Sequence, residues 1–239
     1  MLVSMCFITR SQGHDMQNFE VDLEAFSPSI QRVVGNHLLR ERPARAPDYR
    51  AEVDATTAVV RALLDTPDSV LVKLAQAVKA LTGADSAGIS LAGRQDGRRI
   101  LTWQAAVGLV EKYRGTVLPH DDTPCGPVVD TNQTMLMVDP GLAFSAAAQV
   151  QPPIREVLLV PFHLEGCTVG TVWVISQSDK QFDAEDARLL NNLSELAALA
   201  YQTLTRIGDL ELLTRTVQGV ADKEMGLPGF RSAGERQVT

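Results

Sequence analysis

The residue best suited to chemistry in this chain is a cysteine that follows a helix-start signal. Residues 123–127 read Thr-Pro-Cys-Gly-Pro, and a threonine followed by a proline is typical of the first positions of a helix. Backbone amides point outward at such a start, and they would stabilise the thiolate form of Cys125. The pattern predicts a reactive or ligand-contacting thiol. The alternative, which we favour, is that Cys125 is a small buried side chain.

A histidine and two carboxylates precede this cysteine. His120, Asp121 and Asp122 are adjacent, and imidazole and carboxylate groups are common metal ligands. A solvated acidic turn between two elements has the same composition. We prefer that interpretation, because no other histidine or cysteine stands at ligand spacing, and we expect no metal.

The cysteine count gives no sign of a disulfide framework or of a zinc site. Cys6, Cys125 and Cys167 are an odd number without metal-ligand spacing, so we expect reduced thiols. The sequence also contains no phosphate-cradling loop, no Ser-His-Asp arrangement and no kinase motif. These observations argue against an enzyme.

Length, amino-acid composition and net charge limit the classes of protein to which the chain can belong. The chain has 239 residues, of which 45% are apolar, and a net charge of -7, which indicates one sizeable globular core with appendages. The acidic balance argues against nucleic-acid binding, because neutralising phosphates requires a basic surface. No stretch reaches the roughly 18 apolar residues of a membrane span, and residues 1–8 lack the features of a secretory signal. We expect a cytoplasmic protein whose partners are small molecules or proteins.

Apolar periodicity and turn signals predict the elements that must position these residues. Helical patterns run from residue 53 to Gly83, and Thr66-Pro67-Asp68 starts a second helix within them. Glu165-Gly166 supplies the turn of a buried hairpin, and Asp183 caps a long final helix. The predicted strands are residues 86–92, 99–107, 157–160 and 169–175.

A long irregular connection separates the two hairpins. Residues 108–153 contain many prolines and greatly exceed the usual length of connections in compact domains. Loops of this kind tend to carry function. We expect this segment to fold over one face of the sheet.

The N-terminal region resembles an appendage. Residues 1–52 are rich in arginine, and Pro43 and Pro47 interrupt any helix there. We expect a flexible leader over residues 1–52. A docking segment for an acidic partner is the alternative.

The C-terminal region predicts an interface between two copies of the chain. Apolar residues spaced three or four apart continue from Leu189 to Val220. We expect a helical extension over residues 203–224, which pairs with a second copy in a homodimer, and a disordered tail over residues 225–239. The alternative is a helix that folds back on its own domain.

Five separate segments carry motifs that occur together in one known family. They are residues 84–90, 122–126, 152–162, 166–174 and 182–190. As a set they resemble a GAF domain, most closely those at the front of bacterial sensor kinases. The resemblance implies an α+β fold: a GAF-like central antiparallel sheet of five or six strands, with terminal helices on one face and a ligand-pocket segment on the other. We take residues 53–202 as this domain with its N-terminal helices.

The resemblance says less about the ligand than about the fold. The chain lacks the Asn-Lys-Phe-Asp-Glu signature of members that bind cyclic nucleotides, and Cys125 is followed by Gly126, not by the histidine often found in bilin-binding members. Haem-binding members need an axial histidine, for which His120 is the candidate. These motifs therefore identify no cofactor for this chain.

One enzyme class shares this fold, the free methionine sulfoxide reductases. Cys125 resembles one of their reactive cysteines, but Cys167 falls in the last hairpin and Cys6 in the leader. Because a second thiol must resolve the sulfenic acid, this activity is the less favoured alternative.

The sequence therefore predicts a regulatory module that binds a small molecule in an apolar pocket and signals through its terminal helices in a homodimer, with a possible signalling protein as partner. The alternative is a structural dimerisation module without a ligand. His120 and Asp122 are expected as polar anchors. The residues expected to line the pocket are Trp103, Leu118, His120, Asp122, Cys125, Val128, Phe144, Val160 and Trp173.

Overall fold

The computed structural model describes the backbone of residues 19–224 and the side chains of residues 19–208. Within this range six strands form one antiparallel sheet in the order β3-β2-β1-β6-β5-β4, which confirms the predicted α+β fold. The strands are β1 (Ser86–Gln95), β2 (Arg98–Gly108), β3 (Val117–Pro119), β4 (Met135–Val138), β5 (Glu156–Leu164) and β6 (Cys167–Ser176).

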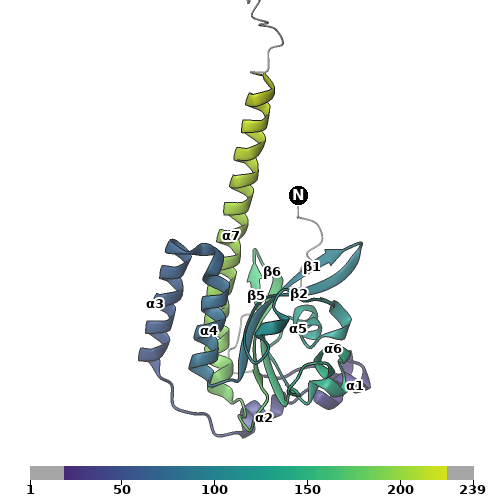
Figure 1. Cartoon of the computed structure of the whole chain (residues 1–239). Helices are drawn as coiled ribbons and strands as arrows, with labels where there is room; N and C mark the ends of the chain where they lie inside the picture. Colours follow the sequence, from purple (N-terminus) through teal and green to yellow (C-terminus); the bar gives the residue numbers. More distant parts are fainter. Residues whose placement is uncertain (1–18, 225–239) are drawn as a thin grey trace, which may run out of the picture.

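Helices lie on both sides of this sheet. Figure 1 shows α3, α4 and α7 side by side on one face, with α5 and α6 on the other. Short 3-10 turns precede or link several helices. The helices are α1 (Pro28–Val33), α2 (Asn36–Glu41), α3 (Tyr49–Asp65), α4 (Val70–Thr82), α5 (Cys125–Thr131), α6 (Ser145–Ala148) and α7 (Ala184–Glu224), and the 3-10 turns are η1 (Leu23–Ala25), η2 (Pro67–Ser69), η3 (Glu111–Tyr113), η4 (His120–Asp122) and η5 (Pro140–Leu142).

The central strands are buried on both faces because their side chains are apolar in both directions. On β5, Leu158 and Val160 belong to the core beneath α4 and α7, which we call the helix-side core. Val157 and Leu159 belong to the core beneath α5 and α6, which we call the loop-side core. Side chains alternate along a strand, so each central strand contributes to both cores.

Tight turns set the register of the two hairpins. Asp96-Gly97 and Glu165-Gly166 both have positive φ at their two residues, as a type I′ turn requires. The turn predicted at Glu165-Gly166 is therefore confirmed. Gly83 is left-handed at the end of α4, as the helix-stop signal predicts.

A bulge in β2 decides which face Trp103 occupies. Ile89 pairs with Ala105 and the next residue, Ser90, pairs with Trp103, so Gln104 has no partner on β1. An extra residue of this kind reverses the alternation of the strand. Ala105 lies in the helix-side core, whereas Trp103 lies in the loop-side core.

The structure differs from the expected leader over the described part of residues 1–52. Residues 19–48, which we call the strap, run along the outer edge of β4, where Val34 forms an antiparallel bridge with Met137. Val33 and Leu39 are buried. The strap is fixed because it places apolar and polar side chains against the sheet, which the local arginine and proline content does not reveal. Residues 1–18 lie outside the described part.

Asn36 ties the strap to this edge of the sheet. Its side-chain amide donates to the carbonyls of Phe19 and Thr134, and its carbonyl accepts from the Leu136 amide at 2.8 Å. Gly35 N also donates to the Leu136 carbonyl at 2.8 Å. The strap therefore satisfies backbone groups of the β4 edge that would otherwise be unpaired.

Helix α7 begins at a reciprocal cap and extends beyond the sheet (Figure 1). The Asp186 amide donates to the Asp183 carboxylate, and the Asp183 amide donates to the Asp186 carboxylate. This capping-box arrangement confirms the predicted cap at Asp183. The backbone of residues 203–224 is helical, and residues 225–239 lie outside the described part. In the part of the chain that the structure describes, no helix combines the length and apolarity of a membrane span.

Replacing Asn36 with alanine tests whether the strap is part of the fold. We expect the free energy of unfolding to fall by about 2–4 kcal/mol, because buried backbone groups of Phe19, Thr134 and Leu136 lose their partner. Urea denaturation measures it. Asn192→Ala, which removes one exposed hydrogen bond to Glu52, is the control and should cost less than about 0.5–1 kcal/mol. Equal, small losses for both variants would mean that the strap contributes nothing to stability.

Candidate functional site

Two tryptophans form the centre of the loop-side core. The ring centroids of Trp103 and Trp173 are 4.7 Å apart, at an interplanar angle of 44°. Gly88 makes room for them, since a Cβ there would lie 2.2 Å from the Trp173 ring. Trp173 pairs with Gly88 on β1 and with Leu159 on β5. The sheet therefore fixes Trp173 rigidly beside Trp103.

A small polar network lies beneath this pair. The Trp173 indole N–H donates to Ser90 Oγ at 2.9 Å, and the Cys125 thiol donates to the same oxygen at 3.5 Å. Ser90 pairs across the sheet with Trp103 on β2 and with Thr171 on β6. The site is thus a row of polar side chains set into an apolar face.

Two polar atoms near this network are left without a partner. Trp103 Nε1 and Thr171 Oγ1 are buried and find no hydrogen-bond partner among the described residues, although the Thr171 hydroxyl lies near enough to the Cys125 thiol to favour its thiolate form. Most buried polar groups in native proteins are paired, and an unpaired one costs about 1–3 kcal/mol. A partner for the Trp103 N–H would recover that energy.

A small cavity adjoins the tryptophans. Its volume is about 20 Å³, roughly the space of one water molecule. Four of the residues expected to line the pocket do so: Trp103, Leu118, Cys125 and Trp173. The sequence analysis missed the rest of the wall, which comprises Thr123, Pro124, Ala146, Ala147, Ile154, Val157, Leu159 and Ile175.

Helix α6 closes this cavity from outside. Ala146 and Ala147 supply part of the wall, and Asp122 holds the helix in place. The Asp122 carboxylate accepts from the Ser145 amide at 2.7 Å and from the Ser145 hydroxyl. Asp122 was expected as a polar anchor within the pocket. Its carboxylate instead fixes the segment that covers the cavity.

Val160 was predicted to line the pocket, and this is wrong. It lies in the helix-side core, while its neighbours Val157 and Leu159 face the cavity. The cause is the alternation of β5, whose register the sequence does not specify. Val128 and Phe144 are buried in the loop-side core but do not reach the cavity wall.

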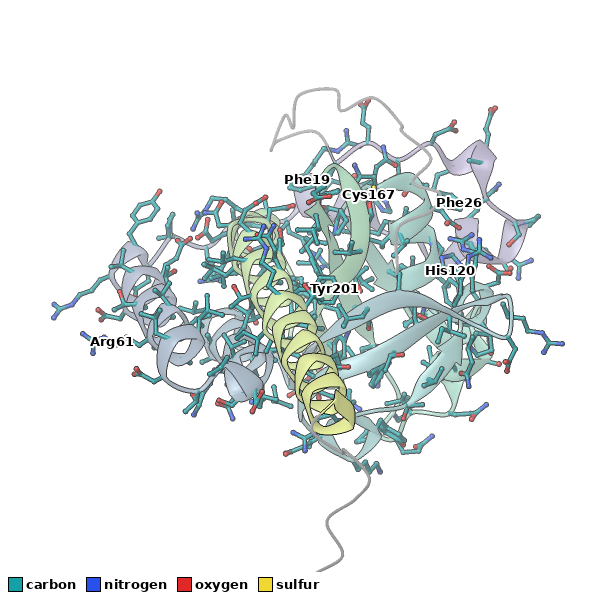
Figure 2. All side chains as sticks on the ribbon, turned by 90° about the horizontal axis from the view of Figure 1, so that it is seen from above. Phe19, Phe26, Arg61, His120, Cys167 and Tyr201 are labelled. Atoms are coloured by element: carbon teal, nitrogen blue, oxygen red, sulfur yellow. The ribbon has the colours of Figure 1, made fainter. Side chains whose placement is uncertain are left out.

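His120 is also turned away from the cavity. Only 2% of its surface is exposed, and its two ring nitrogens contact Asp121 at 2.9 Å and Arg99 at 2.5 Å. Figure 2 shows His120 on the opposite side of the molecule from Arg61, which belongs to α3. Because both nitrogens already have partners, His120 does not present a ligand to haem. Within the described residues, no group of three or more histidine, cysteine or carboxylate side chains forms a metal site.

Cys125 is the first residue of α5 and therefore lies at the predicted helix start. Its backbone amide donates a hydrogen bond to Thr123 Oγ1 at 3.0 Å. The thiol is only 3% exposed. Burial raises its pKa, and the nearby hydroxyl groups of Thr171, Ser90 and Thr123 only partly oppose this effect. The structure therefore favours the small buried side chain over the reactive thiolate, because desolvation of the buried thiol outweighs the effect of the helix start. Cys167 is disulfide-bonded, which corrects the expectation of a reduced thiol, and Cys6 lies outside the described residues.

A second cavity of about 180 Å³ lies where the strap meets α3, α4 and α7. Its acidic groups already have partners. Glu52 and Glu185 both bind Arg188, and Asp48 caps α3 through the Ala51 amide. This cavity therefore presents no unpaired charge to a ligand.

Alkylation tests the burial of Cys125. With iodoacetamide at neutral pH, we expect the native protein to label at Cys125 at least about a hundredfold more slowly than the urea-unfolded protein, because reaction requires local opening. The raised pKa acts in the same direction, since it lowers the thiolate fraction. Peptide mass spectrometry follows the Cys125 peptide, and a Cys125→Ala variant confirms its assignment. Native labelling at the unfolded rate would restore the reactive-thiol hypothesis.

Solved structures of low sequence identity share this fold. One is the GAF domain of the Acinetobacter phosphoenolpyruvate-protein phosphotransferase, with a TM-score of 0.52 and 15% identity over 65% of this chain and 93% of that one. Another is the free methionine-R-sulfoxide reductase of Neisseria meningitidis in complex with its substrate, with a TM-score of 0.52 and 16% identity over 70% and 97%. A third is the GAF domain of the Coxiella burnetii phosphoenolpyruvate-protein phosphotransferase, with a TM-score of 0.53 and 15% identity over 67% and 99%.

No curated protein matches the chain. These structural similarities concern the fold alone, because their sequence identities are low. A family model described as the GAF domain matches residues 65–202, a segment that includes the whole sheet, the two tryptophans and the first part of α7. Since this match covers more than half of the 239 residues, the chain belongs to the GAF domain family.

Proposed function

We propose that the protein is a regulatory GAF module that binds a small molecule between Trp103 and the α6 segment and signals through α7. The GAF family is mostly regulatory and sensory, although some proteins of this fold are enzymes. The observation that carries the proposal is the unpaired indole N–H of Trp103. A ligand with a hydrogen-bond acceptor would complete it once the site opens and exposes this N–H, because the surface of the closed cavity is apolar.

Ligand entry requires the site to open. The cavity of about 20 Å³ is far below the roughly 300–1,000 Å³ of typical ligand pockets, so Trp103 or α6 must move. Helix α6 is a single turn, Ser-Ala-Ala-Ala, and its alanines present little apolar surface to hold it on the sheet. The signal is then a population shift, in which the ligand binds the open arrangement better than the closed one.

The second candidate function is a structural module without a ligand. The same small volume favours it, because Trp103 and Trp173 occupy the space that a ligand would take. The two candidates differ in what they expect of Trp103. A structural role requires no ligand to pair this N–H, whereas a regulatory role pairs it when the ligand is bound.

A sulfoxide reductase activity has less support. Cys125 is buried with a raised pKa, and Cys167 is disulfide-bonded on the β5–β6 hairpin. Sulfoxide reduction by a thiol needs an accessible thiolate and a second thiol to resolve the sulfenic acid. The described residues do not bring two such groups together.

Native mass spectrometry of the purified protein, followed by a thermal-shift screen of a metabolite library, tests the ligand. We expect one small molecule per protomer, which raises the melting temperature. Trp103→Phe should weaken its binding by about five- to a hundredfold, because one hydrogen bond is lost. Trp173→Phe is the matched control, since that N–H already binds Ser90, and it should weaken binding less. The structural alternative predicts no bound molecule and no stabilising compound.

The proposal also includes a homodimer through α7. Helix α7 has 41 residues and is about 60 Å long at 1.5 Å per residue. Beyond its contacts with the sheet, Leu199 and Ile207 are 45% and 38% exposed. Both belong to the apolar stripe that the sequence continues to Val220, whose side chains beyond residue 208 lie outside the described part. A second α7 would cover this stripe.

The double variant Leu199→Glu/Ile207→Glu tests the dimer. It places charges in the apolar stripe, so the dissociation constant should rise at least about a hundredfold. The domain should stay folded, because both side chains lie outside its core. Analytical ultracentrifugation measures the change. Thr205→Glu, a substitution at an exposed position on another side of α7, is the control and should leave association unchanged. A wild-type protein that sediments as a monomer would contradict this part of the proposal.

A further inference from the structure

The start of β5 connects the cavity wall with the strap. Ile154 and Val157 line the cavity, and Glu156 stands between them with 5% of its surface exposed. The Glu156 carboxylate accepts two hydrogen bonds from Arg42, at 2.6 and 3.0 Å. It also accepts the Phe182 amide at 3.1 Å. A buried carboxylate cannot easily lose such partners, so a displacement of β5 has to move Arg42 and Phe182 with it.

Arg42 and a second arginine of the strap, Arg45, hold the cap of α7. Arg42 donates to the Phe182 carbonyl at 2.7 Å, one residue before the cap. The Arg45 amide donates to Asp183 at 3.0 Å, and its guanidinium donates to Asp186 at 2.9 and 3.1 Å. Asp186 is fully buried. These contacts link residues more than a hundred positions apart and join the strap to the first turn of α7.

Lys180 completes the charge balance of this cluster. Its ammonium group binds Asp186 at 2.9 Å, while Arg45 binds the other carboxylate oxygen of the same residue. Asp183 and Asp186 are meanwhile occupied by each other's amides. The cap of α7 is therefore built from charges that the strap neutralises, and it would be weakened if Arg42 and Arg45 moved away.

We propose that Arg42 and Arg45 of the strap are positioning residues that couple the cavity wall at β5 to the first turn of α7. When the cavity opens, Ile154 and Val157 of its wall move together with Trp103 or α6, Glu156 carries Arg42 with it, and the stability of the α7 cap changes. The inference rests on the proposed function in that the cavity is taken as the input site and α7 as the output. It does not depend on which molecule enters.

An engineered occupant tests this coupling in the full-length chain. Trp103→Ala should open a cavity that binds indole, as apolar cavities left by large-to-small substitutions do, and calorimetry confirms the binding. Hydrogen exchange with mass spectrometry then follows the amides of residues 182–189 with and without indole. We expect indole to change their exchange rates by about threefold or more when Arg42 is present. In the Trp103→Ala/Arg42→Gln variant this response should be lost.

Arg40→Gln is the matched control. It removes an arginine of the same strap whose partner, Glu20, is exposed, and it should keep the indole response. A response that persists with Arg42→Gln would overturn the proposal, and so would the absence of any response in Trp103→Ala with indole bound. Because indole fills an engineered cavity, the outcome does not depend on whether a natural ligand is found.

A second pair of variants keeps the test decisive if Trp103→Ala does not fold or does not bind indole. Val157→Ala alters the wall next to Glu156, whereas Leu159→Ala alters the same wall two residues further along β5. We expect Val157→Ala to change exchange at residues 182–189 by about twofold or more, non-additively with Arg42→Gln. Leu159→Ala should act additively. Additive effects for both variants would overturn the coupling.

Discussion

The structure depends on one constraint, which is that the central strands are apolar on both faces. An antiparallel sheet often leaves one face to solvent, but β5 and β6 are buried in both directions over most of their length. Two separate covers are therefore required. Helices α4 and α7 supply one, and the irregular connection with α5 and α6 supplies the other. The second cover is built from short elements, and the candidate site lies beneath it.

This division would allow one sheet to hold both the proposed input and the proposed output. Trp103, Ser90 and Trp173 face the loop side, while the alternate residues of the same strands pack against α4 on β1 and β2 and against α7 on β6. A change on one face reaches the other only by moving strands or by passing around the edge. The strap passes around the edge, from the β4 side of the sheet to the cap of α7. It offers a route of paired charges from the start of β5 to the cap of α7, so the whole packed core does not have to deform.

Local signals in the sequence predict the framework well. The turn at Glu165-Gly166, the helix stop at Gly83 and the cap at Asp183 depend on residues close together in the chain. The family motifs predict the sheet and the position of Cys125 at the start of α5. The two tryptophans were also expected in the pocket, because they are the large apolar residues of strands on its face.

The rest of the fold and of the candidate site depends on strand register and on ion pairs between residues that are far apart in the sequence. The bulge at Gln104 turns Trp103 toward the cavity. The alternation of side chains along β5 turns Leu159 toward the cavity and Val160 toward the opposite face of the sheet. A serine within the apolar sequence Ile89-Ser90-Leu91 is the one local signal that could have identified Ser90. The strap was missed because Arg42 and Arg45 find their carboxylates at Glu156 and Asp186. No local pattern in residues 1–52 encodes those partners.

The central claim is that the Trp103 N–H is unpaired until a ligand supplies an acceptor. The chain has two tryptophans, so a nitrogen–proton NMR spectrum contains two indole signals, which Trp173→Phe assigns. In the purified protein freed of small molecules, the account predicts that the Trp103 indole proton resonates upfield of that of Trp173, which is bonded to Ser90, and moves downfield when a ligand binds. A Trp103 signal that is already hydrogen-bonded without ligand, or unchanged by any compound that stabilises the protein, would contradict it.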